Sequence, residues 1–177
     1  MMHRNLHKNS GFSLIEVIIA IGIISILAGV AIPGIKNWMP NYRLKAMARD
    51  LYSNMQRAKI EAVKSNKDVL ISFVAGAYDP AGRIGSYRVF VDDSPVNGVF
   101  DAGEKVLAQV NMPQNVSLYN ITGFTGNTTA GFDSRGLPCT LLGSVEFQNN
   151  NSIYYQVSLS TAGNVKIKRS NDGATWN

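Results

Sequence analysis

The sequence contains little of the chemistry on which most enzymes and metal sites rely. Cys139 is its one cysteine, and His3 and His7, both within the first eleven residues, are its two histidines. A single cysteine excludes a disulfide within the chain, and we favour a buried structural thiol over a reactive or intermolecular one. The rest of the chain offers no histidine for a catalytic triad or a zinc site. Since phosphate-binding loops and paired catalytic carboxylates are not recognisable either, we expect a protein that is not an enzyme.

Charge is also scarce and unevenly placed. The 17 basic and 12 acidic residues give a formal charge of +5, too mild to indicate a nucleic-acid partner by itself. Residues 17–35 carry no formal charge, and as a helix they would span about 28 Å at ~1.5 Å per residue, close to the ~30 Å hydrocarbon core of a bilayer. Glu16 stands at the head of this run. Because ionisable residues in membrane segments are costly, Glu16 is the leading candidate functional residue.

Two interpretations of this N-terminal region compete. Residues 1–11 are basic, as in an ordinary secretory signal, whose apolar part would be residues 17–27 and whose cleavage site would be Gly29-Val30-Ala31. The alternative is a retained membrane helix. Gly22 and Gly29 would then let neighbouring helices approach closely, and Pro33 predicts a helix break.

The retained helix is favoured by the motif that precedes it, Gly11-Phe12-Ser13-Leu14-Ile15-Glu16. This motif resembles the class III signal of type IV pilins and of the pseudopilins of type II secretion. The resemblance implies that residues 1–11 are a leader, that a prepilin peptidase cuts after Gly11, and that Phe12 is methylated by the same enzyme. It also implies that Glu16 pairs with the N-terminal amine of a neighbouring subunit. Pro33 falls where many pilins have a proline.

The helical period continues beyond the apolar run, and residues 36–66 read as an amphipathic continuation of the helix. Apolar residues recur at alternating spacings of four and three, which predicts one buried stripe: Leu44, Ala48, Leu51, Met55, Ala58 and Ala62. The other faces are rich in lysine and arginine. Basic residues on this side of a membrane helix oppose the positive-inside rule, so a head outside the cytoplasm is implied by the family resemblance alone.

Residues 67–177 change to an alternating pattern that predicts strands separated by glycine-containing turns. The predicted strands are residues 69–74, 87–91, 106–110, 116–121, 130–133, 144–148, 154–159 and 165–168. The expected fold is therefore α+β, a lollipop in which residues 12–35 form a membrane-embedded helix. The second half of the helix would pack on a C-terminal head that is an antiparallel β-sandwich.

Three further stretches narrow the resemblance to the GspH/FimT group of minor pseudopilins and pilins: residues 56–63, 132–138 and 157–167. This resemblance implies a β-sandwich head and a low-abundance place in the filament, at or near its tip. The group often has an arginine after its last glycine, where this chain has Asn164.

Two ligand sites are weaker candidates. Asp93, Asn97, Asp101 and Glu104 have the spacing of calcium-loop positions one, five, nine and twelve. Pro95 occupies position three, however, where an oxygen ligand is needed. The alternative is a hairpin loop that uses these residues for turn chemistry, and no other cofactor is predicted.

The second ligand site is basic. Lys166, Lys168 and Arg169 would lie on or beside one face of the last strand, where they could contact DNA phosphates. The alternative is an edge strand that lysine keeps soluble.

The sequence thus predicts a minor pilin or pseudopilin, anchored by a single pass in a bacterial inner membrane and then assembled with other pilins. The filament would be an extracellular type IV pilus or a periplasmic secretion pseudopilus, between which the sequence does not decide. The alternatives are a filament module that binds DNA or a surface ligand, and an unrelated signal-anchored β domain outside the cytoplasm.

Overall fold

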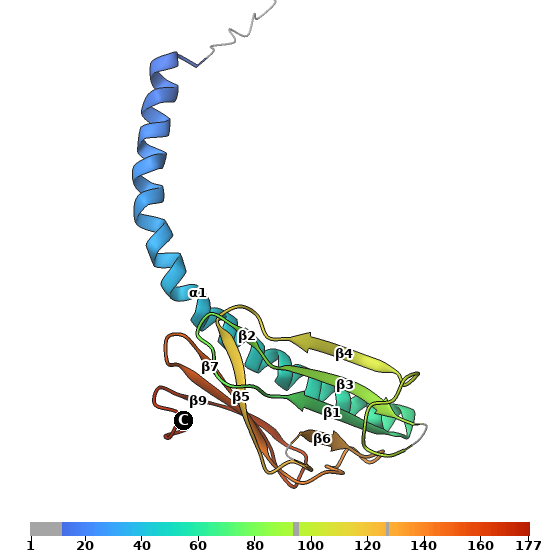
Figure 1. The fold of residues 1–177 in the computed structure, drawn as a ribbon. Helices are drawn as coiled ribbons and strands as arrows, with labels where there is room; N and C mark the ends of the chain where they lie inside the picture. The colour runs from blue at the N-terminus through green and yellow to red at the C-terminus, as the bar shows by residue number, and fades with distance from the viewer. Residues whose placement is uncertain (1–11, 94–95, 127) are drawn as a thin grey trace, which may run out of the picture. The chain divides into compact units, whose positions relative to one another are not determined.

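The computed structural model of the chain describes residues 12–93, 96–126 and 128–177. In these residues the chain forms one helix, α1, and nine strands, β1–β9 (Figure 1). It divides into two compact units, with the boundary between Trp38 and Met39.

Helix α1 spans Leu14–Ser65 and contains 52 residues. Its first turn is closed by the carbonyl oxygen of Ser13, which accepts hydrogen bonds from the N–H groups of Glu16 and Val17 at 3.1 and 3.2 Å. The helix ends before Asn66, whose left-handed φ of 54° is typical of a helix C-terminus. Helix α1 continues through Pro33, and the kink predicted near Gly29–Pro33 stays a prediction. Proline removes one backbone hydrogen bond, and the bonds on either side can hold the helix together.

The second part of α1, residues 39–65, is amphipathic, as its sequence predicts. All six residues of the predicted apolar stripe have an exposed fraction of 0%: Leu44, Ala48, Leu51, Met55, Ala58 and Ala62. They join inward-facing residues of the strands in one hydrophobic core. The prediction that this stripe packs on the domain that follows is confirmed.

The strands form two sheets. The first is antiparallel throughout and has the order β4-β3-β1-β6. Its strands are β1 (Asp68–Val74), β3 (Ser86–Asp92), β4 (Val106–Asn111) and β6 (Thr129–Phe132). The second has the order β2-β5-β7-β8-β9. Its strands are β2 (Arg83–Ile84), β5 (Val116–Thr122), β7 (Ser144–Asn149), β8 (Tyr154–Leu159) and β9 (Val165–Ser170).

Each of the eight predicted strands is present, so the α+β fold with antiparallel sheets is confirmed. The strand that we missed is β2, which pairs in parallel with β5. Two residues are too few to show an alternating pattern, and this strand therefore leaves no signal in the sequence.

Polar contacts fix the head portion of α1 against the strands. The hydroxyl of Tyr87 on β3, itself 1% exposed, donates to the carboxylate of Asp50 and accepts from the amide of Asn54 at 2.9 Å. At the start of this portion, Asn149 Nδ2 on β7 donates to Asn41 Oδ1 at 2.7 Å. Figure 1 shows this part of the helix running along β1 and β3.

Candidate functional site

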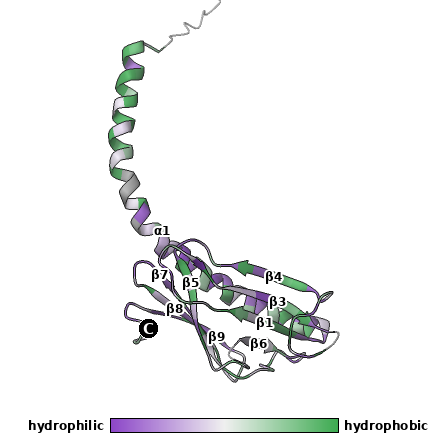
Figure 2. Ribbon diagram, viewed as in Figure 1, coloured by the Kyte–Doolittle hydropathy of each residue, from purple (hydrophilic) through white to green (hydrophobic). Residues whose placement is uncertain are grey.

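The first part of α1, Leu14–Lys36, is an apolar surface that is not buried among the described residues. Its most apolar window has a mean hydropathy of 2.7, and none of that window is buried. Figure 2 shows this segment coloured mainly as hydrophobic. As a helix of 23 residues, it is about 35 Å long, enough to cross the hydrocarbon core of a membrane. The segment is long and apolar enough to lie in a membrane or among other apolar helices.

Glu16 lies in the first turn of this helix. Its side chain is exposed. The ion pairs found within the described residues all lie elsewhere, and no side-chain hydrogen bond satisfies its carboxylate there. The helix N-terminus favours a negative charge, but an apolar environment would leave the carboxylate without a strong partner. In such an environment, a group outside these residues would have to compensate its charge.

The predicted processing site is only partly within the structure. Gly11 lies outside the described residues. Phe12 precedes the helix and is 83% exposed, and Ser13 also lies outside the helix. The residues just after the predicted cut are therefore open to an enzyme.

Among the described residues, the glycines of the apolar segment have no packing partner. A Cβ atom added at Gly22, Gly29 or Gly34 would meet no atom within 4 Å. Their small size is therefore not explained by contacts of the described residues. It suits close approach by a second helix, as we predicted for Gly22 and Gly29.

The loop between β3 and β4 uses its polar side chains in turns. Asp92, which is 3% exposed, accepts hydrogen bonds from the N–H groups of Asn97 and Gly98 at 3.3 and 2.9 Å. Glu104 accepts from the N–H groups of Asp93 and Asp101 at 3.2 and 2.9 Å. These contacts are those of the hairpin alternative.

The predicted calcium ligands are also engaged with other side chains. Asp93 pairs with Lys67 at 2.6 Å, and Asn97 Nδ2 donates to Asp101 Oδ2 at 2.7 Å. Among the described residues, no group of three or more histidine, cysteine, aspartate or glutamate side chains could hold a metal ion. Calcium binding by Asp93, Asn97, Asp101 and Glu104 stays a prediction.

The predicted basic site lies on β9, an edge strand of the second sheet. Lys166, Lys168 and Arg169 are all exposed. Lys166 and Lys168 alternate with Val165 and Ile167, which face the core, so the two lysines share the outer face. The structure brings these cations together as predicted, and it fits the DNA-binding and the edge-protection interpretations equally well.

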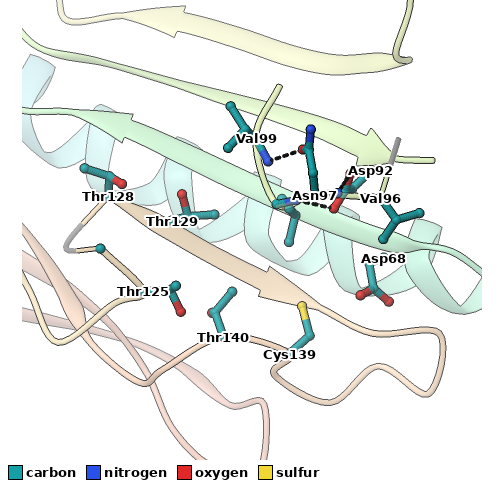
Figure 3. A pocket seen from close by; sticks show the side chains of 13 residues that line it. Asp68, Asp92, Val96, Asn97, Val99, Thr125, Thr128, Thr129, Cys139 and Thr140 are labelled. Carbon is teal, nitrogen blue, oxygen red and sulfur yellow. Dashed lines mark hydrogen bonds between the residues drawn. The ribbon is translucent and has the colours of Figure 1, made fainter. Parts of the chain in front are cut away.

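A cleft of about 550 Å³ in the head was not predicted. Figure 3 shows Asp68 and Asp92 near one another, threonines on the opposite side, and Cys139 between them. Burial raises the pKa of Asp68, with smaller contributions from the carboxylates of Asp133 and Asp92. The carboxylates meet because Asp68 on β1 is opposite Asp92 on β3. Only the strand register could have revealed this pair.

Cys139 is exposed, and our prediction of a buried cysteine was wrong. Its thiol nevertheless has the chemistry of a desolvated group, because partial burial and the nearby carboxylate of Asp68 raise its pKa to about 12. It stays protonated at neutral pH, and such a thiol is a poor nucleophile.

Comparisons with known proteins agree with the geometry of both units. The family described as "Type II transport protein GspH" matches residues 47–163. The "Prokaryotic N-terminal methylation motif" matches residues 6–32. A pilin-like protein, PilA1 of Thermus thermophilus, is 30% identical over 164 residues, which cover 89% of this chain and 97% of that protein.

Among solved structures, the type IV minor pilin FimU of Pseudomonas aeruginosa aligns with a TM-score of 0.48 and 15% sequence identity. The alignment covers 77% of this chain and 94% of FimU. The family assignment rests on the sequence matches, which span the membrane-length helix and most of the head. With a methylation motif at its N-terminus and a GspH match over more than half of its length, this chain belongs to the GspH family of type IV pilin-like proteins.

Proposed function

We propose that the chain is a minor pilin or pseudopilin subunit, which is cut after Gly11, methylated at Phe12 and built into a helical filament. The observation that carries this proposal is the combination of an apolar helix that is not buried with a carboxylate, Glu16, at its head that has no ion-pair partner among the described residues. A filament supplies what both lack, since neighbouring helices cover the apolar surface and the amine of an adjacent subunit can pair with Glu16.

The proposal places the chain in the inner membrane before assembly, with the head outside the cytoplasm. Prepilin peptidase and other pilins are then its partners. The match to the methylation motif over residues 6–32 supports this processing. Pilin families are structural proteins, which also agrees with a role in assembly rather than catalysis.

Replacing Glu16 tests the role in assembly. Glu16→Ala should leave membrane insertion unchanged, because it removes a charge from an apolar segment, and it should strongly reduce recovery of the protein in sheared filaments. Glu16→Asp keeps the negative charge and is the matched control, for which we expect at least partial recovery. Normal incorporation of Glu16→Ala would contradict the proposed pairing.

The phenotype of a gene deletion distinguishes a type IV pilus from a secretion pseudopilus. Deletion of the gene should abolish or reduce twitching and transformation if the filament is a type IV pilus. It should instead reduce release of secreted proteins if the filament is a secretion pseudopilus. Incorporation of the protein into either filament supports the assembly role, and the phenotype identifies the system.

DNA binding is a second candidate function, favoured by the three exposed cations of β9. Such binding would be independent of sequence and would weaken as salt rises. The full chain in detergent can be titrated with labelled duplex at low salt. We expect a K166Q/K168Q double variant to lose affinity and the control Lys45→Gln, an exposed lysine on α1, to retain it. No binding by the wild-type protein would remove this function.

A further inference from the structure

The two sheets have four edges, and three of them are covered, short or protected by charge. At β6, Cys139 N–H donates to the carbonyl of Gly131 at 3.2 Å, and Phe132 forms a bridge with Pro138. At β9, Arg169 exchanges two backbone hydrogen bonds with Asn177 at 2.9 and 3.0 Å. The third edge strand, β2, is only two residues long. Short edges and covered edges are the usual protection against pairing with another chain.

Strand β4 is the exception. It is six residues long and contains no charged residue, whereas β9 carries three cations. Met112 N–H donates to the carbonyl of Gly85 on the β3 side. Because backbone direction alternates along a strand, the N–H and C=O groups of Gln109 and Asn111 point away from β3. Within the described residues, no hydrogen bond satisfies this outer edge.

The side chains of β4 are also incompletely covered. Ala108 and Val110 face the core opposite Val89 and Tyr87, yet both are only partly buried, as is Leu107. On the opposite face Val106 is 42% exposed. An additional strand would cover the apolar core side and satisfy the open backbone groups. This is the mode of recognition in which a peptide extends a sheet.

The neighbouring flank of α1 indicates the charge of such a strand. Asn54 hydrogen-bonds Tyr87 on β3, and Glu61 pairs with Lys105, just before β4, at 2.6 Å. Arg57 lies between Asn54 and Glu61 on the same flank, since residues three and four apart share a helix face. Arg57 is exposed and is near enough to Glu61 to lower the pKa of that carboxyl, but within the described part of the chain it forms no ion pair or hydrogen bond. A carboxylate on an incoming strand could pair with it.

A second copy of this chain fits the edge poorly. Two copies could pair β4 to β4, related by a two-fold axis, or β4 to β9. Either arrangement would bring Arg57 towards a strand that offers no carboxylate. We propose that the outer edge of β4 binds an extended segment of a different protein, apolar on its core side except for a carboxylate that pairs with Arg57.

The test uses the full chain in detergent and a fluorescent peptide, Thr-Val-Thr-Glu-Thr-Val-Thr-Val, followed by anisotropy. Wild type should bind it saturably. Gln109→Pro removes an outward N–H without breaking a backbone hydrogen bond to β3 and should weaken binding by at least about tenfold. It also loses the side-chain hydrogen bond from Arg88, as Gln109→Ala does. Gln109→Ala keeps the N–H and should bind like wild type. Asn111→Pro repeats the test if Gln109→Pro does not fold by circular dichroism.

Charge reversal tests the carboxylate. Arg57→Glu should lose affinity for this peptide and prefer one in which lysine replaces its glutamate. The proposal is overturned if wild type binds neither peptide, if the proline variants bind like wild type, or if Arg57→Glu leaves the preference unchanged. It is also overturned if the wild-type chain forms dimers that Gln109→Pro abolishes, because the occupant is then a second copy.

Discussion

The two parts of helix α1 have the same backbone structure and opposite surroundings. In residues 14–36 none of the most apolar window is buried, whereas in residues 39–65 the apolar stripe is completely buried. The head therefore supplies the packing that stabilises the second part, which is how most helices in proteins are stabilised. The first part receives none from the described residues. What surrounds it must then come from outside the described residues, and this is the physical basis for the proposal that it lies in a membrane and then in a filament.

The largest expected effect on stability comes from replacing one large apolar side chain by alanine in each part of α1. Met55→Ala removes a fully buried side chain of the stripe and should destabilise the head by about 2–5 kcal/mol. Ile23→Ala, at a position 54% exposed, should leave the thermal unfolding of the head unchanged. Circular dichroism of the full chain in detergent measures both. Equal destabilisation by the two variants would remove the distinction between the parts.

A smaller effect is expected from the polar contact that holds the second part in place. Tyr87→Phe leaves Asp50 and Asn54 without the hydroxyl between them. We expect a loss of about 1–2 kcal/mol in the free energy of unfolding of the head. Tyr52→Phe is the control, because Tyr52 lies on the same helix at 37% exposure. If both variants unfolded at the wild-type denaturant concentration, the contact would not stabilise the head.

The smallest effect concerns pH. The hydrogen bond from Lys105 lowers the pKa of Glu61 below its ordinary value of 4.5. The positive charges of Lys105, Lys64 and Arg57 lower this pKa further. A lowered pKa stabilises the folded head above pH 4.5, and this contribution is lost as pH falls through the folded pKa. Lys105→Met should therefore unfold at slightly lower temperature than wild type at pH 7 and at the same temperature near pH 3. Lys45→Met should show no such pH dependence; a constant difference for Lys105→Met would contradict the assignment.

The comparison between the parts of α1 also shows what the sequence could reveal. The stripe from Leu44 to Ala62 and the eight longer strands follow local periods, so their pattern is complete within a few residues. Strand β2 is too short to show a period. The helix continues through Pro33, because the preference of one residue does not outweigh that of its neighbours.

Some candidate sites also have a local signal in the sequence, whereas others depend on the fold. Glu16 could be recognised because it is a charge beside a long apolar run, which is a local contrast. The pair Asp68 and Asp92 could not, since strand register brings together residues far apart in sequence. The exposure of Cys139 and the open edge of β4 likewise depend on which segments lie next to them. Neither has a local signal.

The most direct test of the central claim is the intact mass, with N-terminal sequencing, of the protein isolated from membranes. A retained assembly helix predicts that the chain starts at a methylated Phe12, with Glu16 fifth in the mature protein. A chain that starts at Ile32 would show ordinary secretory cleavage after Ala31. Glu16 and most of the uncovered helix would then be lost, and the filament role would be contradicted.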